Sequence, residues 1–415
     1  MSGLINFIGG PLVIIAFTKV LISFVALLLT TLLVVWAERK IIADMQARIG
    51  PNRWGPFGLL QTLADGIKLF FKEDFRPIAA DKWTYAIAPL AAMVPSFLAF
   101  AVIPFGSEVT LGGHKVDFIV SDLNIGILFF LAMGSIGVYG IALAGWSSGS
   151  KYPLLGAVRS SAQLISYEIA LGLSIVPIVL VTSSLSTVDV VAAQSGSINS
   201  VTFFDGIPVL ESISHLFEFL PQWYIWSQWP AFLIFLIAGI AETNRAPFDL
   251  AEAESELVAG FHTEYSGIRF AMFFLGEYIH MVVISAMAVT LFFGGWDGPI
   301  LTRNFEALDW LNWVWPLFWF MLKTGFFVYL FVWLRATMPR LRYDRLMWLG
   351  WKRLIPAALL WIAVTAVVNT EGVSRGVRLG VFGVLFLIVI IWAGKGDPRL
   401  SSAVVPQRRL YRGAT

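Results

Sequence analysis

Carboxylates gather in one short stretch of this chain. Between Glu242 and Glu264, six of them stand against a single arginine, Arg245, and no lysine. Apolar residues such as Phe248 and Leu257 lie between the acids and indicate packing against other parts of the protein. Such groups can take up and release protons, so we interpret the stretch as a buried or half-buried acidic site at a membrane face. The six acids are Glu242, Asp249, Glu252, Glu254, Glu256 and Glu264.

Three more carboxylates are predicted at or below the same face. Glu38 ends the first apolar segment beside Arg39 and Lys40, which we expect to keep it ionised. Glu168 and Glu277 lie inside apolar segments, where a lone charge costs several kcal/mol. His280, three positions after Glu277, should face the same side of a helix, either as a functional group or as a hydrogen-bonded bridge between helices. Charges at successive depths are typical of proton relays.

Metal binding is a second interpretation of the carboxylates at 252–256. Neither an Asp/Asn-rich calcium loop nor a His ligand accompanies them, so proton exchange is favoured over metal. The absence of cysteine excludes iron–sulfur ligation and disulfides within this chain. Only one of the 4 histidines falls in an apolar segment, which is too few for a membrane haem. Any redox centres must therefore belong to partner proteins.

The composition is that of an all-α polytopic membrane protein. Hydrophobic residues make up 58% of the chain and charged residues only 13%. A span needs roughly 20 apolar residues, and nine segments of sufficient length are predicted. They lie near 12–36, 84–104, 123–145, 162–185, 223–241, 268–292, 312–334, 354–369 and 377–393.

The basic residues predict the orientation. Most of the 29 Lys and Arg residues fall in alternate loops, which the positive-inside rule places in the cytoplasm. The N-terminus is then outside and the C-terminus cytoplasmic. We divide the chain into a membrane domain at 1–370, an additional span at 371–394 and a basic cytoplasmic tail at 395–415. The net charge of +2 gives no indication of a nucleic-acid partner.

The first cytoplasmic loop combines stiff turns with an amphipathic helix. Two Gly/Pro pairs between Arg48 and Pro56 force turns that display Arg48 and Arg53. From Leu60 to Lys72, apolar residues recur at three- and four-residue spacing, which predicts a helix lying along the cytoplasmic membrane surface. This helix either only anchors the loop or forms the floor of an opening for a lipid-soluble substrate such as a quinone.

Four motifs together resemble one known family, the H-type membrane subunits of NADH-quinone oxidoreductase, the respiratory complex I. They occur in the same order over about residues 10–370. The motifs are Glu38-Arg39-Lys40 through Gln46, Arg48, Gly50-Pro51-Asn52, Asp65 and Lys68; Lys151-Tyr152 with Ser166-Tyr167-Glu168; Ala241-Glu242-Thr243-Asn244-Arg245 through Glu256-Leu257-Val258; and Arg342-Tyr343-Asp344-Arg345-Leu346-Met347.

The resemblance implies an eight-span subunit that forms much of a quinone chamber, and the span at 377–393 departs from that pattern. NADH, FMN and iron–sulfur clusters would belong to partner subunits: the one with the terminal cluster, the large quinone-site subunit and small membrane subunits. The substrate would be ubiquinone or menaquinone in a bacterial plasma membrane. The implied quinone-binding set is Arg39, Gln46, Arg48, Arg53, Trp54, Asp65 and Phe274. The proton-coupling set is Glu38, Glu168, Glu242, Arg245, Asp249, Glu252, Glu254, Glu256, Glu264 and Glu277.

Two other functions compete with this one. The first is the homologous membrane subunit of a membrane-bound hydrogenase, which needs no quinone. The second is a stand-alone secondary transporter. The complete motifs in the first loop and the acidic stretch favour the quinone enzyme, and the amphipathic helix favours docking to a soluble arm.

Overall fold

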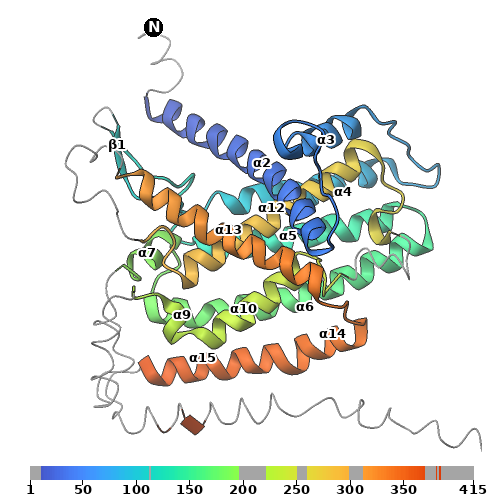
Figure 1. Cartoon of the computed structure of the whole chain (residues 1–415). Helices are drawn as coiled ribbons and strands as arrows, with labels where there is room; N and C mark the ends of the chain where they lie inside the picture. Colours follow the sequence, from blue (N-terminus) through green and yellow to red (C-terminus); the bar gives the residue numbers. More distant parts are fainter. Residues whose placement is uncertain are drawn as a thin grey trace, which may run out of the picture.

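Long helices dominate the architecture in Figure 1, a computed structural model. It describes residues 11–111, 114–195, 221–249, 259–298 and 312–369, with 380, 383 and 384. The longer helices are α2 (Pro11–Met45), α3 (Gln61–Phe71), α4 (Lys82–Phe100), α5 (Gly126–Ser147), α6 (Lys151–Thr182), α10 (Trp229–Glu242), α12 (Gly267–Phe292), α13 (Val314–Thr337) and α15 (Ile355–Asn369). The short elements are η1 (Pro56–Gly58), α7 (Thr187–Ala192), α9 (Tyr224–Ser227), η4 (Gly260–His262), α14 (Tyr343–Leu349) and η6 (Gly350–Leu354). The strands β1 (Val109–Leu111) and β2 (His114–Val116) form an antiparallel hairpin.

Seven helical segments of the described chain are long and apolar enough to cross a membrane. They are α2, α4, α5, α6, α12, α13 and the continuous run from α14 to α15. The predicted all-α polytopic class is confirmed, with the β1–β2 hairpin as a small addition. The predicted ninth span and the basic tail lie outside the described residues, apart from 380, 383 and 384.

The predicted span at 223–241 is divided into α9 and α10. α10 has 14 residues, or about 21 Å at 1.5 Å per residue, less than a bilayer core of about 30 Å. Pro230 has no N–H to donate to the turn before it, so the helix restarts there. Gln228 separates the two helices, and its buried Oε1 accepts a hydrogen bond from Trp361 Nε1 at 2.6 Å.

The first loop folds back on the end of α2. Trp36 Nε1 donates to the carbonyl of Phe57 at 3.1 Å, and α3 contacts both α2 and α12. The predicted amphipathic helix is thereby found, within one residue at each end. Its apolar side chains remain outside the bundle, because Ile67 is 52% and Phe70 71% exposed. An exposed apolar face suits a membrane surface or a partner.

α12 is the most buried of the candidate spans, and its central position lets it carry residues toward several neighbours. In its most apolar window, 72% of the residues are buried, whereas α6 reaches 50%. It contacts α2, α3, α4, α10 and α13, and Figure 1 shows it among them. The Lys323 ammonium of α13 donates to the carbonyls of Phe293, Gly295 and Asp297, just beyond the end of α12. A cation there complements the negative end of the helix dipole.

Candidate functional site

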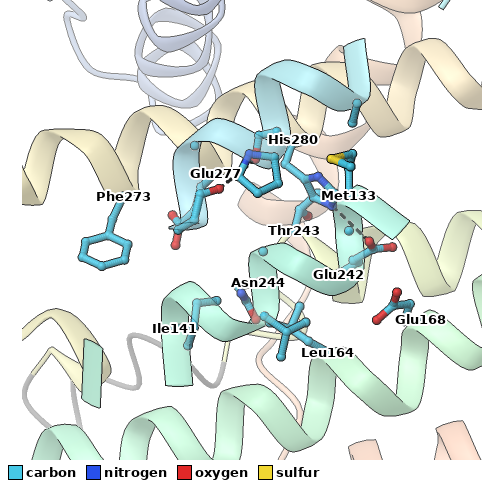
Figure 2. A pocket seen from close by; sticks show the side chains of 18 of the residues that line it. Met133, Ile141, Leu164, Glu168, Glu242, Thr243, Asn244, Phe273, Glu277 and His280 are labelled. Carbon is cyan, nitrogen blue, oxygen red and sulfur yellow. Dashed lines mark hydrogen bonds and ion pairs between the residues drawn. The ribbon is translucent and has the colours of Figure 1, made fainter. Parts of the chain in front are cut away.

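Three carboxylates and one imidazole line a cavity of about 70 Å³ between the helices, which we call the carboxylate cavity. Glu168 comes from α6, Glu242 from the end of α10, and Glu277 and His280 from α12 (Figure 2). The other walls are mostly apolar or glycine, and Ser96, Thr243 and Asn244 complete the polar lining. A cavity of this size and polarity has room for water. In the described chain, no group of three His, Cys, Asp or Glu side chains could hold a metal ion.

Glu242 and His280 form the direct contact in this cavity. His280 Nε2 lies 3.2 Å from Glu242 Oε1, as the dashed line in Figure 2 shows. Glu168 accepts a hydrogen bond from the Ser135 hydroxyl. Gly134 on α5 leaves room for both acids, because a Cβ there would stand 3.0 Å from a Glu242 oxygen and 3.9 Å from a Glu168 oxygen. The two carboxylates therefore lie beside the same point on α5.

Gln163 fixes the acidic segment that follows α10. Its side-chain Nε2 donates to the carbonyl of Ala241 at 2.7 Å and to that of Phe248 at 2.8 Å. Gln163 is fully buried on α6, so both hydrogen bonds lie out of water and hold the segment firmly. α6 thereby fixes where Glu242 and Arg245 stand.

Glu38 is clamped by two arginines from distant parts of the chain. Its Oε2 lies 2.6 Å from Arg245 Nη1, and its Oε1 accepts from Arg335. Glu38 and Arg245 are 3% and 7% exposed, so the pair is buried. Burial alone would lower the pKa of Arg245, but the facing Tyr278 and Glu38 raise it above its ordinary value. The guanidinium lies 3.9 Å from the centre of the Tyr278 ring and stays charged.

The neighbours expected to pair with Glu38 do not do so. Arg39 instead forms an ion pair with Asp65 of α3 at 2.5 Å. Consecutive residues on a helix point about 100° apart, so Arg39 faces α3 while Glu38 faces the bundle. The expectation that Arg39 and Lys40 would be the partners of Glu38 was wrong.

A larger cavity of about 630 Å³ lies on the other side of α12, and we call it the entrance cavity. Four of the predicted quinone-binding residues line it: Arg39, Gln46, Arg48 and Phe274. Glu38, Tyr278 and Arg335 line it as well. Phe274 and Tyr278 are four residues apart and share one face of α12, whereas Glu277 and His280 face the carboxylate cavity.

Several predicted residues lie elsewhere. Asp65 does not line the entrance cavity but holds Arg39, while Arg53 and Trp54 are exposed in the turn before η1. Asp249 and Glu264 are partly buried and line neither cavity. The backbone carbonyl of Glu264 accepts from the Tyr85 hydroxyl at 2.7 Å. Glu252, Glu254 and Glu256 fall outside the described residues.

Arg335 and Tyr278 were missing from the predicted set. Arg335 was counted only as one of the basic loop residues that set the orientation. Its position directly after an apolar run, one turn inside the last residues of α13, was the signal that could have found it. An arginine still within a helix at that depth needs a carboxylate partner, and Glu38 is that partner.

The fold and the site define an α-helical polytopic membrane protein with carboxylates buried between its helices. The model of the NADH dehydrogenase family matches residues 18–366, so the chain belongs to this family. One relative is an NADH-quinone oxidoreductase subunit of Geobacter sulfurreducens, named as the second of the H type, which is 53% identical over 345 residues that cover 83% of this chain and 93% of the relative. The resemblance predicted from the motifs is confirmed.

Proposed function

We propose that this chain is the membrane subunit of a proton-pumping NADH-quinone oxidoreductase that binds the quinone and couples its reduction to proton translocation. The name of the 53% identical relative supports the enzyme class. The observation that carries the coupling role is the position of Glu38. Its carboxylate lines the entrance cavity and binds Arg245, which follows directly on the residues 242–244 that line the carboxylate cavity.

The entrance cavity has the chemistry for a quinone head group. Arg39, Gln46 and Arg48 are hydrogen-bond donors for the two carbonyl oxygens of the quinone. Phe274 and Ile49 supply apolar surface for the ring. A volume of about 630 Å³ falls within the usual range for small-molecule sites.

Coupling follows from the buried charges between the two cavities. Reduction adds electrons to the quinone, and its oxygens take up protons in equal number. A change of charge in the entrance cavity acts strongly on Glu38 and its arginines, because they are shielded little by water. Arg245 then passes the change to Glu242, and from there it reaches Glu168 and Glu277. The segment with Glu252, Glu254 and Glu256 belongs to the same proposed path.

The remaining assignments belong to this proposal too. NADH, FMN and the iron–sulfur clusters are carried by partner subunits, since this chain has no cysteine. The subunit lies in a bacterial plasma membrane with its N-terminus outside. The exposed apolar face of α3 and the open entrance cavity suit contact with the membrane and the soluble arm.

The test is NADH oxidation by membranes that carry Arg39→Ala, measured with a short-chain quinone and with an artificial acceptor that takes electrons upstream. Quinone reduction is expected to fall severalfold while the artificial-acceptor rate is retained. Lys68→Ala, on the exposed part of α3 and outside the entrance cavity, is the matched control. Normal rates of Arg39→Ala with both acceptors would reject the quinone role and favour a hydrogenase-type complex.

A further inference from the structure

His280 occupies a place in the carboxylate cavity that no other basic group shares. It stands on α12 one turn beyond Glu277, and in Figure 2 its ring lies between Glu277 and Glu242. The charged groups that face it are Glu168 from α6, Glu242 from α10 and Glu277 from its own helix. α4 and α5 contribute only apolar residues, glycines and Ser96 to this lining. The cavity thus holds three acids and one base.

Glu242 is poised to exchange a proton with this base. Its Oε1 lies 3.2 Å from His280 Nε2. Its Oε2 is buried and has no hydrogen-bond partner among the described residues, and the whole residue is only 8% exposed. A buried oxygen without a partner is costly to keep charged. Protonation of this carboxylate would remove that cost, and the adjacent imidazole is placed to supply the proton.

We propose that His280 is a further proton-carrying residue of the coupling path, passing protons between Glu277 and Glu242. The inference rests on the proposed function. An imidazole can accept a proton on one nitrogen and release one from the other. A proton from the Glu277 carboxyl joins Nδ1, directly or through water in the cavity, and the Nε2–H bond breaks as its proton joins Glu242 Oε1. Glu277 becomes a carboxylate, Glu242 becomes an acid, and the ring ends neutral.

The test substitutes His280→Gln in the assembled complex. Glutamine can place an amide N–H near the position of Nε2, so it keeps a hydrogen bond to Glu242 but cannot carry protons at neutral pH. Proton translocation during NADH oxidation by quinone is measured in sealed vesicles, together with its pH profile. Ser285→Ala is the matched control, because Ser285 is buried on the same helix and bonds only to the carbonyl of Met281.

A proton-carrying His280 predicts a loss of about tenfold or more in His280→Gln, with the artificial-acceptor rate retained and with a pH profile that lacks the break of the parent complex. Wild-type translocation in His280→Gln would overturn the proposal and leave His280 as a bridge between helices. If the glutamine variant does not assemble, His280→Asn carries the same test. Failure of both variants to assemble would also mean a structural role and overturn it.

A parallel Glu168→Gln variant separates this inference from the proposed function. Loss of translocation in Glu168→Gln with normal translocation in His280→Gln removes only the histidine from the path. Normal translocation in both removes the carboxylate cavity from the path and contradicts the proposed function itself.

Discussion

At the scale of single residues, the contact between Glu38 and Arg245 joins the two cavities, and breaking it should be costly. Removing one partner of a buried ion pair typically costs about 3–5 kcal/mol, because the other charge is left without compensation. We expect Arg245→Met to lower both the thermal stability of the complex and its quinone reduction. Arg342→Gln is the control, because Arg342 and Asp344 form an exposed pair at 3.5 Å, and such pairs contribute little. Equal stability of the two variants would contradict the importance of the buried pair.

His262 gives a residue-scale prediction of acid sensitivity. It is buried in η4 against the rings of Phe261 and Phe270, and burial lowers its pKa from 6.5 to about 4. Between these two values, the unfolded chain binds a proton that the folded chain does not. Folding free energy is therefore lost as the pH falls from about 6.5 to about 4, by up to about 3 kcal/mol.

The measurement is the thermal inactivation temperature of the complex from pH 7 down to pH 4.5. His262→Gln removes the titrating group, so its inactivation temperature should fall less steeply with pH than that of the parent. Parallel curves for the two proteins would show that His262 makes no contribution in this window.

At the scale of elements, apolar periodicity predicted the helices well where one pattern prevailed. α12 begins and ends within a residue of the predicted 268–292, and α3 lies within 60–72. α6 was predicted to begin near residue 162 but begins at Lys151, because polar residues such as Arg159 and Ser160 interrupt the apolar run without interrupting the helix. The division at Gln228 depends on its contact with Trp361, 133 positions away, which hydropathy does not report.

Gly134 offers a prediction about how α5 serves the site. Gly134→Ala puts a Cβ 3.0 Å from a Glu242 oxygen, tighter than ordinary contact, so the carboxylate must shift away from His280. We expect proton translocation to fall while the complex still assembles. Gly325→Ala on α13 is the matched control, because no described atom lies within 4 Å of a Cβ there. If the two alanine variants translocate protons equally well, the close contact at Gly134 has no functional role.

At the scale of the whole molecule, the site is assembled from segments far apart in the sequence. Glu38 and Arg245 are separated by 207 positions, and Glu38 and Arg335 by 297. Residue type and apolar context alone were enough to predict that Glu38, Glu168, Glu242 and Glu277 share one region. They could not predict which arginine meets Glu38, because pairing is decided by how the helices pack. For the same reason the sequence left the role of His280 open.

The coupling of the two cavities through Glu38 is the central claim, and one measurement tests it directly. Sealed vesicles carrying Glu38→Gln are supplied with NADH, and proton translocation and quinone reduction are followed together. We predict that both fall severalfold while the rate with an artificial upstream acceptor is retained, because the neutral amide cannot hold Arg245 and Arg335 as the carboxylate does. Unchanged translocation and quinone reduction in an assembled Glu38→Gln complex would contradict the account.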